Sequence, residues 1–114
     1  MIEWGMPKQG RELKALEVFN SHMQWWTELQ QSGKIEQFMP FGLTTGNVNQ
    51  RSGFVLIAGT TEQIDELRRA EDFRNRYNTV VNVADNVNLV VLETGDAMEA
   101  RLVRYAKSIK ELGE

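Results

Sequence analysis

Two short segments of this chain are apolar at nearly every position, and they restrict its possible folds more than any other feature. They are residues 54–58 and 87–92, with Asn88 as the polar exception. Successive side chains of a strand point to opposite faces of a sheet, so a strand covered on one face alternates apolar with polar residues. The two segments therefore predict strands in a sheet that needs cover on both faces.

Alternation and turn residues predict two further strands. Apolar residues alternate over residues 2–6, which indicates a short first strand. A second is predicted over residues 35–45, where Met39 and Phe41 share one face. Pro40 cannot donate to a ladder, so this strand should lie at an edge of the sheet or carry a bulge.

Apolar residues at three- and four-residue spacing predict helices. The first helix covers about residues 11–32. The second opens with a capping box of Thr60 and Gln63, and its pattern predicts a break around Glu71-Asp72. A second capping box, Asp96 with Glu99, should open the last helix.

The order of these elements is strand, helix, strand, strand, helix, strand, helix. It predicts an α+β fold of the ferredoxin-like type, βαββαβ with an extra C-terminal helix and an antiparallel sheet. Residues 1–114 are too few for two domains, so a single domain is expected.

The sheet of such a fold lacks cover on one face. Both crossovers are right-handed, which places both crossover helices on the same face. The C-terminal helix is too narrow to cover four strands, and it carries a basic stripe of Arg101, Arg104, Lys107 and Lys110. We therefore expect a symmetric homodimer through the sheet face.

Composition excludes several classes of function. The chain has no cysteine and one histidine, which excludes thiolate sites and multi-histidine metal sites, and no cofactor is expected. A net charge of −3 argues against nucleic acid as a partner. Neither a membrane span nor a signal peptide is recognisable, so a cytoplasmic protein without a membrane partner is the expectation.

Short motifs distributed over most of the chain resemble a known family. They are His22-Met23-Gln24-Trp25-Trp26, Ser32-Gly33-Lys34-Ile35, Phe38-Met39-Pro40, Gly53-Phe54-Val55-Leu56-Ile57 and Glu71-Asp72-Phe73. This pattern is similar to the YCII-related domains of the dimeric α/β-barrel superfamily, whose aspartate-proline-phenylalanine turn is Glu71-Asp72-Phe73 here. The resemblance implies a dimer packed sheet to sheet, and a catalytic pair formed by His22 and Asp72.

Candidate site residues also have structural explanations. His22 is the natural start for proton transfer near neutral pH, or it is packed among aromatic side chains and bonded to a backbone carbonyl. Trp25 and Trp26 lie about 100° apart on a helix, which favours Trp26 in the core and Trp25 at a helix or subunit contact. The predicted ligand-binding residues are Trp4, Trp25, Trp26, Met39, Phe41 and Phe54, and no metal site is predicted.

These features predict a small homodimeric protein that binds a small, partly apolar molecule between sheet and helices. Two alternatives stay open. One is a cofactor-independent or haem-dependent monooxygenase, as occurs elsewhere in the dimeric α/β-barrel superfamily, although haem-degrading members have their histidine on the second helix. The other is a non-catalytic interaction module. The residues leave open whether the chain is an enzyme.

Overall fold

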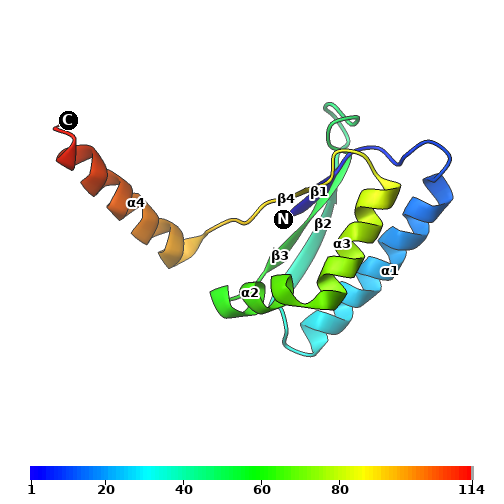
Figure 1. Ribbon diagram of the computed structural model, residues 1–114, viewed down its shortest axis with the longest axis horizontal. Coiled ribbons are helices and arrows are strands. Elements are labelled where there is room, and N and C mark those ends of the chain that lie inside the picture. The colour runs from blue at the N-terminus through cyan, green and yellow to red at the C-terminus, as the bar shows by residue number, and fades with distance from the viewer. Residues whose placement is uncertain (114) are drawn as a thin grey trace.

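The computed structural model describes residues 1–113 and contains four strands and four helices (Figure 1). In chain order they are β1 (Ile2–Trp4), α1 (Glu12–Gln31), β2 (Gln37–Gly42), β3 (Gly53–Ala58), α2 (Thr61–Arg69), α3 (Glu71–Val83), β4 (Asn88–Leu89) and α4 (Gly95–Glu111). None of the helices in this part of the chain combines the length and the apolar character needed to cross a membrane.

The four strands form one antiparallel sheet in the order β2-β3-β1-β4. This is an α+β fold with an antiparallel sheet, the predicted class, and it is compatible with a ferredoxin-like plan. Pro40 lies in β2 at the edge of the sheet, as predicted. The predicted alternative, a bulge, is not observed, because β2 pairs with β3 without one.

The last strand is much shorter than predicted. We expected residues 87–92, but β4 contains only Asn88 and Leu89. Val90 still forms two backbone hydrogen bonds with Met1, each 2.8 Å long, before the chain leaves the sheet. Val91 and Leu92 are exposed, because no neighbouring strand extends far enough to pair with them.

Helices α1 and α3 cover one face of the sheet, and the core lies between them and the central strands (Figure 1). Its buried side chains are Ile2, Trp25, Trp26, Leu29, Ile35, Val55 and Phe73. The predicted helix break occurs at Ala70, one residue before the expected position, because this residue is extended (ψ 134°) and separates α2 from α3.

One of the two predicted capping boxes is present. Thr60 and Gln63 exchange hydrogen bonds at the start of α2, and the Gln63 amide also donates to the Gly33 carbonyl after α1, at 2.9 Å. The box predicted at Asp96 is wrong. Helix α4 starts after Thr94 without a side-chain cap, and Asp96 lies in its first turn, where a negative charge favours the helix dipole.

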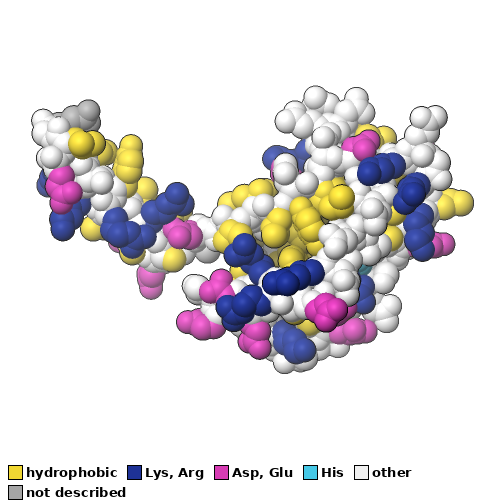
Figure 2. All heavy atoms as spheres, viewed as in Figure 1, with side chains coloured by type: hydrophobic (Ala, Val, Ile, Leu, Met, Phe, Trp, Pro, Cys, Tyr) yellow, Lys and Arg dark blue, Asp and Glu magenta, His cyan; other side chains and the backbone are white. Residues whose placement is uncertain are grey.

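Among residues 1–113 no helix packs on the other face of the sheet, which we call the open face. Four apolar side chains of β2 and β3 form an apolar strip on it: Met39, Phe41, Phe54 and Leu56. The β1–β4 half is polar, because Glu3 is ion-paired with Arg51 and accepts a hydrogen bond from Asn88. Figure 2 shows α4 joined to the rest only by a narrow connection, and no residue of α4 is buried.

Candidate functional site

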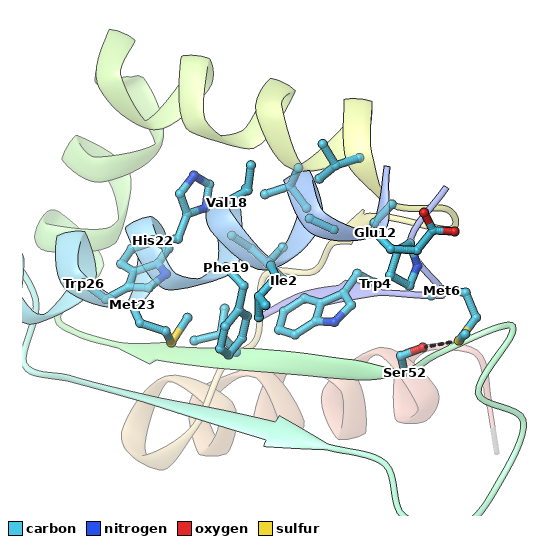
Figure 3. Close-up of a pocket in the computed structure, with 18 residues that line it drawn as sticks. Ile2, Trp4, Met6, Glu12, Val18, Phe19, His22, Met23, Trp26 and Ser52 are labelled. Carbon is cyan, nitrogen blue, oxygen red and sulfur yellow. Dashed lines mark hydrogen bonds between the residues drawn. The ribbon is translucent and has the colours of Figure 1, made fainter. Parts of the chain in front are cut away.

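A cavity of about 470 Å³ lies between α1, the central strands and the end of α3 (Figure 3). Its lining is mostly apolar. The residues are Ile2, Trp4, Gly5, Met6, Pro7, Glu12, Ala15, Leu16, Val18, Phe19, His22, Met23, Trp26, Ser52, Val55, Val80, Val83 and Ala84. His22, Met23 and Trp26 are grouped at one end, while Met6, Glu12 and Ser52 are at the other (Figure 3).

Trp4 forms part of the wall on the sheet side, and its position depends on a glycine. Its ring is edge-to-face with Phe19 of α1, with 6.1 Å between the centroids. A Cβ atom on Gly53 would lie 3.0 Å from the Trp4 ring and 2.6 Å from the Phe41 carbonyl oxygen. Only glycine at position 53 therefore allows β3 to pass this close to the indole.

The adjacent tryptophans of α1 share one environment, contrary to the expectation from their helical spacing. Their ring centroids are 4.6 Å apart, and both rings face Phe73 of α3 at 6.5 Å. Both side chains are buried in the core, and the Arg76 guanidinium lies 4.8 Å from the centre of the Trp25 ring. Trp26 is thus in the core as predicted, Trp25 is in the core and at the contact between α1 and α3, and only Trp26 lines the cavity.

Besides the indole nitrogens of Trp4 and Trp26, three side chains bring polar atoms to this apolar cavity: Glu12, His22 and Ser52. Glu12 accepts a hydrogen bond from the Gly10 amide. The Ser52 hydroxyl donates to the Val48 carbonyl and contacts the Met6 sulfur, the dashed contact in Figure 3. Within residues 1–113 the His22 imidazole makes no such bond, so its ring nitrogens are available to a ligand.

The half-buried His22 imidazole is neutral at physiological pH. Burial, and to a smaller extent the nearby Arg76 charge, lower its pKa to about 4, while the Asp72 charge acts in the opposite direction. Asp72 itself is paired with Arg76, whose Nε lies 3.7 Å from its Oδ1. His22 and Asp72 do border one shallow surface hollow between α1 and α3, but no hydrogen bond joins them in the described residues.

The predicted ligand-binding residues do not form one site. Trp4 and Trp26 line the cavity, whereas Met39, Phe41 and Phe54 lie on the open face. There Phe41 and Phe54 stack, with centroids 4.7 Å apart and planes 20° from parallel. The separation follows from strand geometry, because neighbouring side chains on β2 and β3 alternate between the two faces.

Several cavity residues were not singled out from sequence. Phe19 and Met23 belong to the apolar stripe of α1, so the helical pattern could have indicated them. Ser52 comes from a polar loop, and Val80 and Val83 come from the end of α3. The Ser52 amide donates to the Trp4 carbonyl, and the packing of α3 on α1 brings Val80 and Val83 to the cavity. Both are long-range contacts that no local sequence pattern predicts.

Neither metal ligands nor comparisons with known proteins help to identify the function of this site. Among residues 1–113, no three acidic or histidine side chains are close enough together to hold a metal ion. No protein-family model matches the chain, and neither does any curated protein or solved structure.

Proposed function

We propose that this protein binds a small, partly apolar molecule in the cavity between α1 and the sheet. The observation that carries the proposal is an apolar cavity of about 470 Å³ with one neutral imidazole in its wall. Ligand sites in proteins are commonly clefts of roughly 300–1,000 Å³ with mostly apolar walls and few polar groups. The cavity has this size and composition.

Exposed apolar side chains at the cavity margin favour a ligand over an empty packing defect. Met6, Leu16 and Phe19 line the cavity and are also exposed to solvent. A bound apolar group would remove part of this surface from water, which contributes roughly 2.5 kcal/mol per 100 Å². The margin therefore supplies a driving force that a closed void would lack.

His22 would act in binding rather than in proton transfer at neutral pH. A general base works best when its pKa is near the working pH, and the pKa of His22 is about 4. The neutral ring offers one donor and one acceptor to a hydroxyl or carbonyl group of the ligand. Asp72 would influence this ring through its negative charge, which partly offsets the effect of the Arg76 charge on the pKa of His22.

We also propose that the fold is ferredoxin-like and that the chain is related to the YCII-related domains. We propose further that the protein forms a homodimer through the open face. The strand order β2-β3-β1-β4 with α1 and α3 on one face supports the first point. The apolar strip supports the dimer, because an uncovered apolar area beside a polar one is typical of interfaces.

A series of 4-alkylphenols tests the ligand proposal by isothermal titration calorimetry. Each added methylene should increase affinity about fourfold until the cavity is full, since burying one CH₂ contributes about 0.8 kcal/mol. Ala15→Phe places an aromatic ring in the cavity and should weaken binding strongly. The matched variant Asn20→Phe, at an exposed position of α1, should bind like the natural protein.

Two further measurements separate the role of His22 from that of the cavity. His22→Ala should weaken binding of the phenols but leave binding of the matching alkylbenzenes nearly unchanged. Circular dichroism should show that Ala15→Phe is still folded. Absence of binding for every chain length, or equal binding by the Ala15→Phe and Asn20→Phe variants, would overturn the proposal.

A further inference from the structure

Helix α4 is amphipathic, and in the described part of the chain none of its residues is buried against another element. Its apolar stripe consists of Met98, Leu102, Tyr105, Ile109 and Leu112 at alternating four- and three-residue spacing. Ile109 is half-buried and the other four are exposed. A helix with such a stripe is normally stabilised by packing that stripe against another surface.

The apolar strip of the open face has the width of one helix. It spans two strands, about 10 Å, and the stretches 39–41 and 54–56 make it about 10 Å long. Helix α4 has 17 residues, so it is about 25 Å long and about 10 Å wide. Both views in Figures 1 and 3 show α4 on the side of the sheet away from α1, which is the side of the open face.

We infer that α4 of one chain packs on the apolar strip of a second copy, and that the two copies exchange these helices reciprocally. The inference rests on the proposed homodimer and specifies the element that covers the open face. A two-fold axis parallel to the strands places the β4 edge of one copy above the β2 edge of the other. The short connector after β4 then delivers α4 to the partner's strip.

The area favours helix exchange over direct contact between the two strips. Two strips of roughly 10 by 10 Å in direct contact present a flat footprint of about 200 Å² in total, while specific dimers bury about 1,200–2,000 Å². Reciprocal exchange makes two helix–strip contacts, so its flat footprint is about 400 Å² before side-chain relief and the part of α4 beyond the strip are counted. The exchanged arrangement therefore buries about twice the area of direct contact between the strips.

Paired substitutions on α4 test the inference by light scattering at micromolar concentration. The natural protein should have about twice the 13.1 kDa mass of one chain. Leu102→Glu places a charge on the stripe and should raise the dimer dissociation constant at least 100-fold. Val103→Glu is the control, because Val103 is similarly exposed (66% against 58%) but lies about 100° away around the helix.

Single cysteines locate the contact, since the chain has none of its own. The variants Met39→Cys and Leu102→Cys are mixed, refolded together and oxidised, with Met98→Cys and Tyr105→Cys as alternatives to Leu102→Cys. A disulfide that joins position 39 of one chain to α4 of the other is expected. Because each chain carries one cysteine, this bond can form only between copies.

The outcomes separate the two proposals. A monomeric natural protein overturns both the dimer and the exchange. A dimer that responds equally to Leu102→Glu and Val103→Glu, or a cross-link only between two Met39→Cys chains, overturns the exchange and leaves a sheet-to-sheet dimer. In the double variant Met39→Cys/Leu102→Cys, a disulfide confined to a 13.1 kDa species would show that α4 folds back on its own strip, which also overturns the exchange.

Discussion

Adjacent residues of β3 show how differently the two faces of the sheet are used. Val55 is 2% exposed beneath α1 and α3, while its neighbour Leu56 is 36% exposed on the open face. Both are aliphatic, and both belong to one strand that is apolar throughout. An apolar strand therefore indicates that both faces of the sheet need to be covered. Whether the cover comes from the same chain or from another is decided by the surrounding elements.

The most severe effect is expected from a charge introduced on the covered face of the sheet. Val55→Asp buries a charge without a partner, which costs several kcal/mol, so the chain should not fold. Leu56→Asp, one residue away, should remain folded and lose only its self-association. Circular dichroism and light scattering measure the two effects. Folding of both variants, or unfolding of both, would contradict the distinction between the faces.

Two glycines that are cross-strand partners should differ in how well they tolerate alanine. Gly53→Ala should lower the free energy of unfolding by about 1–3 kcal/mol, because the new Cβ overlaps the Trp4 ring and the Phe41 carbonyl. Its cross-strand partner Gly42 has no atom within 4 Å of a new Cβ, so Gly42→Ala is the control and should be nearly neutral. Urea denaturation of both variants checks the difference.

The third effect concerns the charge state of His22 on the covered side. Between pH 6.5 and about 4 the unfolded chain binds a proton at this imidazole that the folded chain does not. The free energy of unfolding should therefore fall as the pH is lowered through this window, by about 1–2 kcal/mol once partial exposure is allowed for. In His22→Gln this part of the pH dependence should disappear; an unchanged slope would contradict the lowered pKa.

The smallest effect is a change in the pKa of His22 itself. Arg76→Gln removes a nearby positive charge, so the pKa should rise from about 4, while Asp72→Asn should lower it. Arg74→Gln, on the same helix, is the control. The single histidine makes the NMR titration unambiguous. The pKa of His22 should shift in opposite directions in Arg76→Gln and Asp72→Asn, and shifts in the same direction would contradict the prediction.

The sequence was a good guide wherever local pattern decides structure. The α+β class, the edge position of Pro40, the capping box at Thr60 and the core position of Trp26 follow from periodicity and backbone chemistry. It was a poor guide to the end of β4, because strand length depends on how far the neighbouring β1 extends.

The candidate site was predicted in part for the same reason. Trp4, Trp26 and His22 do meet at one cavity, but Met39, Phe41 and Phe54 lie on the opposite face of the sheet. Sequence alternation placed Met39 and Phe41 on one face of their strand, yet it could not say which face would meet the helices, nor on which face Phe54 of the next strand would lie. That choice is made by the crossovers, which are a property of the whole chain.

The amide of Gln63, which bonds both Thr60 and the Gly33 carbonyl, has a consequence for local unfolding. Helix α2 buries no residue, so its order depends largely on these few hydrogen bonds and on the chain segments that they join. Elements with little buried surface open more often than the global unfolding free energy implies. Amide hydrogens of α2 should thus exchange with solvent well before those of α1, as a separate cooperative unit beside a more durable core.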